Sequence, residues 1–472
     1  MTVASPQFLA FVAIAALLYN LLSHSLWRGL VMLAANIAFL ASITRDPGAF
    51  LPLMAFLLAG YLAIKSVEVS KSERLLAVLA VALIVLFCWL KKYFFLSFLG
   101  FLDWAYVTLG LSYIFFRVLA LLIDVANGEV EHPPSALEYL NFTLNFPTLT
   151  AGPIQRYQDY VASERSLTWA GAGEACERIT IGFFKVIALS GVIGSLQKSA
   201  ISAMLEQSTF AGIVAYAVAG IGLYPIFLYY NFSGYTDIVI GVGRFFLREY
   251  PENFNYPFSS KNFLEFWTRW HMSLSNWLRD YLYTPLLFAL LRRFDRPGVE
   301  NYLGPLAFFV TFFVIGIWHG STVVFAIYGL LLGLGVSVNK LYQTIMIGRL
   351  GRSGYRQLGS NPLYIAAARG LTFTWYAACM LFFWADATEL QAISSHIGVA
   401  GAVASFGALF LLTSMALPVV EIAINASTPD RLRSAWENAY VKSALAGVLA
   451  FFCFVAVLAT STSGPQIIYQ AF

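Results

Sequence analysis

Residues 303–342 read LGPLAFFVTFFVIGIWHGSTVVFAIYGLLLGLGVSVNKLY. They contain two apolar runs, 303–318 and 321–342, which meet at a short turn that carries His319. About 20 apolar residues are enough to span the hydrocarbon core of a bilayer as one helix. The stretch therefore predicts two membrane helices joined close to His319.

Comparable apolar runs cover most of the chain. They lie near 7–23, 29–43, 50–66, 74–98, 103–126, 179–205, 209–231, 366–386, 396–422 and 443–461. Only 11% of the 472 residues are charged, whereas a soluble domain carries about 25%. The composition thus predicts an all-α, polytopic integral membrane protein with no separate soluble domain. Positive loops of a membrane protein account for the net charge of +4, so the charge does not imply nucleic-acid binding.

The placement of Lys and Arg predicts the orientation of the chain. No basic residue precedes the first apolar run, whereas Arg28 follows it, which favours an external N-terminus. Basic residues gather in 261–296 and again in 349–356, so both stretches are expected in the cytoplasm. The two runs between them must then form a hairpin, which places His319 deep in the membrane or towards its outer face.

Two segments depart from the apolar pattern. In 135–160, prolines and a glycine interrupt the helix, and such backbone at membrane depth must be buried in protein or line a cavity. From Lys261 to Leu291 the composition is helical, with an interruption predicted at Pro285. Five apolar residues share one face of that helix: Trp267, Trp270, Leu274, Trp277 and Leu278. The helix either lies along the membrane interface or packs, buried, under the bundle.

Two of the five histidines are candidates for chemistry. An ionisable residue between apolar segments is costly in a membrane, so His319 points to function, although a neutral imidazole bonded between helices is the alternative. Burial favours the neutral imidazole, which is the form that a general base needs. For His271, a functional role and a solvated side chain fit the sequence pattern equally well. We expect His24, His132 and His396 to cap helices or to be solvated.

Other polar groups have structural explanations. Asp237 lies in an apolar stretch, where a buried structural hydrogen bond is the preferred interpretation. Arg279 and Asp280 fit a structural ion pair, and an arginine here could equally hold a phosphate. The four cysteines form no CxxC pair, so neither a metal site nor a disulfide framework is expected.

Two runs carry a resemblance to a known family. NFNYPFSSKNFLEFWTRWHMSLSNWLRDYLYTPL (253–286) and GIWHGSTVVFAIYGLLLG (316–333) resemble the membrane-bound O-acyltransferase (MBOAT) superfamily. Within it they are most similar to bacterial polysaccharide acylases, such as alginate O-acetyltransferase and the D-alanyl transferase of teichoic acids. The resemblance extends over about 110–345. It implies a single domain, 1–472, with this catalytic core and with peripheral helices at 1–109 and 346–472.

The resemblance implies a ring of tilted transmembrane and re-entrant helices around a central tunnel, in a bacterial inner membrane. An acyl group, with acetyl as the first expectation, would pass from a cytoplasmic thioester to hydroxyls of an exported envelope polysaccharide. Acetyl-CoA or another acyl thioester is then the co-substrate, and no bound cofactor or metal is expected. The acceptor is the polysaccharide itself or a periplasmic or extracellular acyltransferase partner.

The resemblance places the family's catalytic histidine on His319 and its second polar position on His271. We expect His319 to act as general base on the acceptor hydroxyl, and His271 to position a substrate or to stabilise the oxyanion. Candidates for the wall of the substrate site are Asn255, Trp267, Arg269, Trp270 and Trp318.

Two alternatives stay open at this point. D-alanine could be transferred from a carrier protein that docks near 261–296. The chain could also be a transporter or flippase, in which the histidines relay protons. The run LLFALLRRFDRPG after the tyrosine-rich YLYTPL replaces a Gly-rich step of the alginate branch, which leaves the donor undecided.

Overall fold

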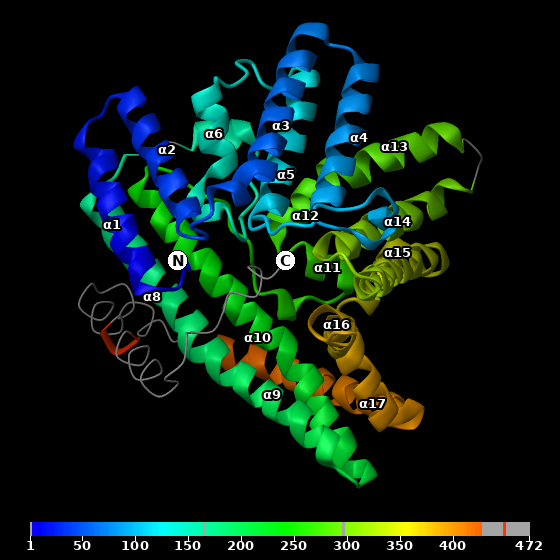
Figure 1. The fold of residues 1–472 in the computed structure, drawn as a ribbon. Coiled ribbons are helices and arrows are strands. Elements are labelled where there is room, and N and C mark those ends of the chain that lie inside the picture. Colours follow the sequence, from blue (N-terminus) through cyan, green and yellow to red (C-terminus); the bar gives the residue numbers. More distant parts are fainter. Residues whose placement is uncertain (1, 164–165, 295–297, 427–446, 450–472) are drawn as a thin grey trace. The chain divides into compact units, whose positions relative to one another are not determined.

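The computed structural model describes residues 2–163, 166–294, 298–426 and 447–449 (Figure 1). Within these ranges the regular elements are helices, and an isolated β-bridge joins Phe254 to Trp270. The same ranges hold 8 helices that are long and apolar enough to cross a membrane. The expected all-α, polytopic membrane protein is therefore confirmed. The ring of helices around a central tunnel stays a prediction.

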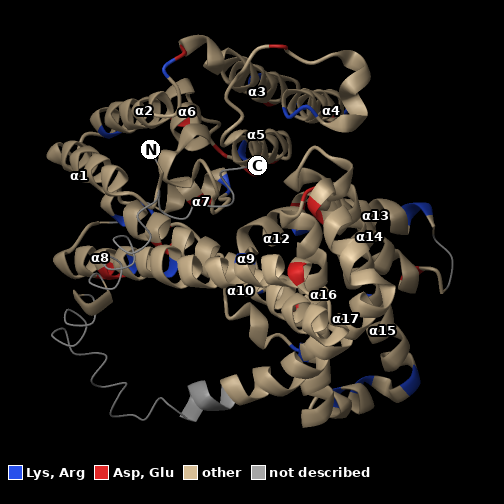
Figure 2. Cartoon of the chain, turned by 60° about the horizontal axis from the view of Figure 1, so that its bottom comes forward, with Lys and Arg blue, Asp and Glu red and all other residues tan. Residues whose placement is uncertain are grey.

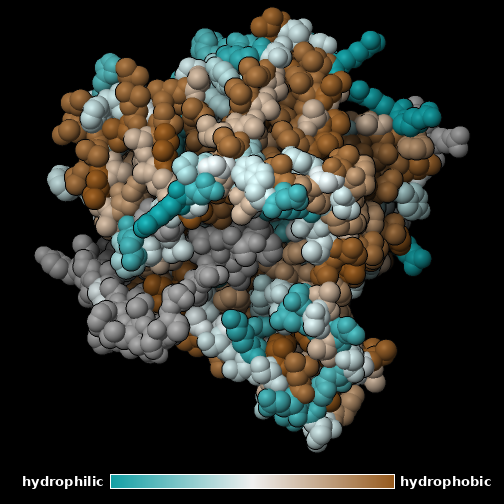
Figure 3. Space-filling view, in the orientation of Figure 1, coloured by the Kyte–Doolittle hydropathy of each residue, from teal (hydrophilic) through white to brown (hydrophobic). Residues whose placement is uncertain are grey.

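The candidate membrane spans account for most of the apolar runs in the sequence. They are Pro47–Ser70, Glu73–Leu90, Trp169–Glu206, Phe210–Phe245, Glu300–His319, Val323–Leu358, Pro362–Trp384 and Ala387–Val420. Lys, Arg, Asp and Glu lie mostly at helix ends and in the connecting loops (Figure 2). Hydrophobic side chains cover much of the face shown in Figure 3, and Leu17 and Met415 are 75% and 74% exposed. Lipid is the solvent that suits such a surface.

Two of the expected runs do not correspond to a described helix over their full length. The run 103–126 is helical only from Leu111 onwards, so its first part was predicted wrongly. Most of 443–461 lies outside the described residues.

The helices group into two compact units. The first contains residues from Met1–Ile187 and Asn231–Glu252. Its helices are α1 (Pro6–Leu21), α2 (Ser25–Ala41), α3 (Leu51–Ser70), α4 (Glu73–Leu90), α5 (Leu111–Ala126), α6 (Ala136–Leu144), α7 (Tyr157–Ala162), α8 (Trp169–Phe184) and the end of α10 (Phe210–Phe245). Helix α5 is buried along nearly its whole length, because α3, α4 and α6 all pack against it.

A buried arginine accompanies the interrupted segment that follows α6. The helix ends at Leu144, which confirms the break predicted in 135–160. Arg117 of α5 is 2% exposed and donates hydrogen bonds to the carbonyl oxygens of Thr143 (2.8 Å) and Thr148 (2.9 Å). Carbonyls near a helix end lack intrahelical partners. The guanidinium supplies these partners inside the protein, as broken backbone at membrane depth requires.

Asp237 of α10 lies in a network of ion pairs in this first unit. Its two carboxylate oxygens lie 3.1 Å from Arg178 Nε and 2.7 Å from Lys185 Nζ. Arg178 also contacts Glu252, at 2.6 Å. This geometry fits the structural role expected for Asp237.

The second unit contains Ala188–Tyr230 and Asn253–Val448. Its helices are α9 (Ser190–Glu206), the start of α10, α11 (Phe263–Trp267), α12 (Met272–Leu278), α13 (Thr284–Arg293), α14 (Glu300–His319), α15 (Val323–Leu358), α16 (Pro362–Trp384) and α17 (Ala387–Ala426). Helix α16 packs against both α15 and α17.

Helices α14 and α15 form the hairpin predicted from the sequence. They pack so closely that a methyl group on Gly316 would lie 2.0 Å from the Cα of Gly329. Farther from the turn, the same methyl on Gly333 would lie 2.8 Å from the carbonyl oxygen of Phe309. Small residues permit this approach of two helix backbones in a membrane protein. The hairpin therefore depends on glycine on both of its helices.

The break predicted at Pro285 is wrong. The chain is interrupted earlier, between the end of α11 at Trp267 and the start of α12 at Met272. Beyond α12 a π-helical turn, Arg279–Tyr283, leads directly into α13, and Pro285 lies in the first turn of that helix. The wider π turn accommodates a proline, which cannot supply the usual helical N–H.

The aromatic face predicted for this segment is buried within the second unit. Its exposed fractions run from 2% to 8%, for Trp267, Trp270, Leu274, Trp277 and Leu278. A helix that lies along the membrane interface would turn this face to lipid. The burial therefore favours the other interpretation, a segment packed against its own protein.

Candidate functional site

His271 lies in the break between α11 and α12 and is 1% exposed. Its backbone has φ +44° and ψ +52°, in the left-handed region, which histidine adopts more often than most non-glycine residues. The neighbouring backbone is held by pairing with an earlier segment. Met272 N donates to Asn253 O, and Asn255 N donates to Arg269 O, both at 2.9 Å. This pairing, formed over a distance in sequence, compensates for a conformation that costs about 1–3 kcal/mol.

Asn253 fixes the tautomer of His271. Its Oδ1 accepts hydrogen bonds from Ser273 N (3.1 Å) and Ser273 Oγ (2.9 Å), and lies 3.2 Å from His271 Nδ1. Because a backbone N–H can only donate, the side-chain atom of Asn253 at this position must be the oxygen. His271 Nδ1 therefore carries the proton, and Nε2 of the neutral ring is left as an acceptor. Asn253 Nδ2 is buried and has no hydrogen-bond partner among the described residues.

Burial lowers the pKa of His271 well below its ordinary value, and the nearby His319 lowers it further. His271 is therefore neutral at physiological pH. Both predicted histidines belong to the second compact unit, and both are buried there.

His319 is the last residue of α14 and is 5% exposed. Its ring centroid lies 5.1 Å from that of Phe383 in α16 and 5.8 Å from that of Tyr328 in α15. The next residue, Gly320, approaches the ring of Phe325 so closely that a methyl group there would lie 2.1 Å from it. Side chains from three helices thus surround the imidazole.

Helix α16 contacts His319 and the residue that precedes His271. Tyr376 packs against Trp270, the residue before His271, with the ring centroids 5.2 Å apart. Phe383, about two turns later on the same helix, contacts His319. The aromatic side chains of α16 therefore form a wall that contacts His319 and the tryptophan beside His271.

The three predicted tryptophans lie near this wall. Trp318 packs beside His319, at 4.6 Å between ring centroids. Trp267 packs against Phe312 of α14, and within the described part of the chain its buried Nε1 has no hydrogen-bond partner.

Asn255 and Arg269 are placed differently. The side chain of Asn255 is exposed, and its backbone N–H makes the pairing described above. Arg269 is half-buried, with its guanidinium 2.8 Å from Glu265 and 3.1 Å from Ser259 Oγ. The structure gives both residues structural contacts and does not bring them to the buried histidines. Arg279 and Asp280 pair with each other at 2.8 Å.

Sequence reasoning missed Asn253, Tyr376 and Phe383. Asn253 precedes His271 by 18 residues, and its link to the histidine depends on the backbone pairing rather than on any local pattern. The aromatic residues of α16 lie in a run that the sequence marks only as an apolar span.

The sequence of the chain is similar to the sequences of known proteins. The sequence profile of the membrane-bound O-acyltransferase family matches residues 75–383. The teichoic acid D-alanyltransferase of Bacillus subtilis is 32% identical over 231 residues, which are 47% of this chain and 56% of that protein. The probable alginate O-acetylase of Pseudomonas putida is 32% identical over 234 residues, or 49% and 45%. The peptidoglycan O-acetyltransferase of Helicobacter pylori is 30% identical over 211 residues, or 44% and 38%. The chain thus spans about half the length of the first two relatives and less of the third.

Proposed function

The chain belongs to the membrane-bound O-acyltransferase family, and on that premise we propose that it transfers an acyl group from a thioester to hydroxyls of an exported cell-envelope polysaccharide. The observation that carries the proposal is that His271 and His319 are both buried in one compact unit, where rings of α16 contact His319 and the tryptophan beside His271. Buried imidazoles suit proton transfer away from bulk water. We retain 1–472 as a single domain with its catalytic core at about 110–345.

His319 is the general base in this proposal. It takes the proton of the acceptor hydroxyl while the hydroxyl oxygen attacks the carbonyl carbon of the thioester. The carbon–sulfur bond then breaks, and the departing thiolate takes the proton back from the imidazolium. The acceptor gains the acyl group and the donor leaves as a thiol, so atoms and charges balance without a bound cofactor.

His271 has the role of positioning the acceptor. With Nδ1 donating to Asn253, its Nε2 can accept a hydrogen bond from a substrate hydroxyl but cannot donate one to an oxyanion. This supports the positioning role over the oxyanion role that the sequence left open. Asn253 Nδ2, buried and without a partner in the described structure, is the better candidate for the oxyanion donor.

We propose acetyl-CoA as donor, on the cytoplasmic side of a bacterial inner membrane. The similarity to proteins named for O-acetylation supports an acetyl group. The acceptor is the polysaccharide or a periplasmic or extracellular partner that completes the transfer.

D-alanyl transfer from a carrier protein is the second candidate, since the Bacillus subtilis relative carries that activity in its name. A purified chain that transfers acetyl directly from acetyl-CoA supports the first candidate. Capture of an aminoacylated carrier, with no use of acetyl-CoA, supports the second. Membership of an acyltransferase family gives the transporter alternative no support.

Mass spectrometry of envelope glycans, with and without the intact gene, tests the proposal and identifies the acyl group. The matched variants are His319→Ala and, as control, His132→Ala, whose side chain is exposed in a loop. We expect His319→Ala to reduce acylation about 100-fold to 10,000-fold and His132→Ala to retain it. A folded His319→Ala protein that acylates its polymer at the normal rate would exclude the proposed base.

A further inference from the structure

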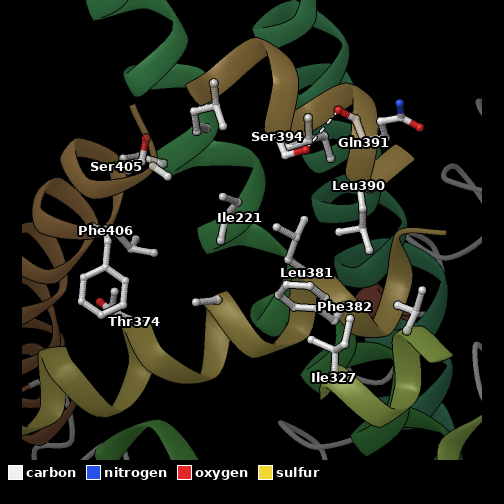
Figure 4. A pocket seen from close by; sticks show the side chains of 18 of the residues that line it. Ile221, Ile327, Thr374, Leu381, Phe382, Leu390, Gln391, Ser394, Ser405 and Phe406 are labelled. Atoms are coloured by element: carbon white, nitrogen blue, oxygen red, sulfur yellow. Dashed lines mark hydrogen bonds between the residues drawn. The ribbon is translucent and has the colours of Figure 1, made fainter. Parts of the chain in front are cut away.

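A cavity of about 660 Å³ lies among α10, α15, α16 and α17 of the second unit (Figure 4). Its volume is in the range of sites that hold small molecules. Ile221, Ile327, Leu381, Phe382 and Leu390 are among the apolar side chains that line it. All four helices are candidate membrane spans. Neither His271 nor His319 lines the cavity, and the cavity has no part in the proposed reaction.

The kink in α17 shapes this cavity. Gly398 has φ +61° and ψ +174°, which interrupts the helix. Residues before the kink, such as Leu390, and after it, such as Leu409, both line the cavity. A side chain at position 398 would be strained in this conformation, so the glycine lets the two arms of α17 face the same space.

Ser405 is a polar residue in the lining of this cavity. Its side chain is 4% exposed, and its hydroxyl has no hydrogen-bond partner in the described part of the chain. A serine or threonine inside a helix usually bonds the carbonyl oxygen four residues earlier, as Thr413 of the same helix does with Leu409 at 2.8 Å. Ser405 lines the cavity, but its hydroxyl oxygen is enclosed by protein, so an occupant meets an essentially apolar surface.

The surroundings define the occupant by its chemistry. An apolar cavity offers water few partners and does not hold it stably. In a bilayer the abundant apolar molecules are the hydrocarbon chains of lipids. We propose that this cavity binds one hydrocarbon chain of a membrane lipid.

The bound chain would support the helices that hold His319. Val324 and Ile327, which line the cavity, belong to the first turns of α15 after the His319 turn. Phe382, also in the lining, precedes Phe383, which contacts His319. Occupancy would therefore brace α15 and α16 from behind the histidine.

Native mass spectrometry of the purified full chain tests the proposal, with retained lipid as the readout and no need for acyl transfer. Ala402 lines the cavity, whereas its neighbour Val403 does not and is 68% exposed. We expect Ala402→Phe to reduce the lipid-bound fraction about tenfold, since the new ring displaces several methylenes of the chain. Val403→Phe is the matched control and should retain lipid. Equal retention by the two variants would overturn the proposal.

Two further arms identify the lipid and guard against a variant that fails to fold. A diazirine-bearing phospholipid added to the unmodified chain should crosslink to 374–382 and 390–409, and crosslinks confined to other helices would refute the site. Retention of an ester-linked phosphatidylethanolamine by the unmodified chain would identify a phospholipid acyl chain as the occupant. Preferential retention of a polyprenyl phosphate by the unmodified chain would identify an isoprenoid as the source of the bound chain.

Discussion

Gly316→Ala tests whether close contact of the α14–α15 hairpin positions His319. The added Cβ would lie 2.0 Å from Gly329 Cα and 2.2 Å from Gly329 N. Carbon atoms in favourable contact are about 3.5 Å apart, so the two backbones must separate by roughly 1.5 Å. Neither contact is with a flexible side chain, and the strain therefore falls on the helices themselves.

The displacement is expected to reach the proposed base, because His319 is the residue that ends α14. Misplacement of a catalytic group by about 1 Å can reduce a rate about 100-fold. We therefore expect acyl transfer to fall about 100-fold. Overpacking of this kind also costs about 1–3 kcal/mol of stability, which should lower the thermal midpoint.

Gly304→Ala in the same helix is the matched control. The nearest atom to its Cβ would be Tyr283 Oη, at 4.0 Å, and alanine is the better helix former. Transfer rate and thermal unfolding should be measured for both variants in the same lipid. If the two variants behave alike in both assays, the argument from backbone contact is refuted.

Three further variants test the contacts of Asn253, Asp237 and His271. Asn253→Leu removes the hydrogen-bond acceptor shared by His271 and Ser273, so the free energy of unfolding should fall by about 2–3 kcal/mol. Ser273→Ala should reduce the free energy of unfolding clearly less. Equal losses for the two variants would contradict the shared acceptor. Asp237→Leu leaves Lys185 without this carboxylate, whereas Arg178 keeps Glu252, and it should cost about 1–3 kcal/mol. Transfer per folded molecule should be unchanged, and a change in that rate would give Asp237 a role beyond structure. Because the pKa of His271 is lowered in the folded protein, the unfolded chain alone takes up this proton below about pH 6.5. Stability should therefore fall as the pH drops through that value, and His271→Asn should flatten this part of a thermal profile measured from about pH 5 to pH 8; an unchanged profile would contradict the lowered pKa.

Local patterns in the sequence predicted the hairpin that carries His319. Two apolar runs between basic stretches leave few other arrangements in a bilayer. Helix α14 follows its run closely, whereas α15 begins with its run and continues to Leu358. The interruption after α6 was equally visible, because its prolines act on the backbone directly.

The environment of His271 could not be predicted in the same way. Helical spacing continues across 268–271, and the break depends on pairing with Asn253–Asn255, which no local pattern reveals. Pro285 misled for a related reason, since the π turn before it absorbs the proline without ending the helix. The role of Asn253 as acceptor for His271 likewise depends on tertiary contact.

The contacts of His319 with the α14–α15 hairpin and with α16 differ in how well they tolerate substitution. In the α14–α15 hairpin, the backbones of Gly316 and Gly329 lie in close contact, and a larger residue at either position would shift the imidazole. On the α16 side the neighbour is the ring of Phe383, a side chain that can be replaced without moving a helix backbone. Relatives or engineered forms that accept a bulkier acyl group should therefore carry a smaller residue at Phe383, with the glycines left untouched.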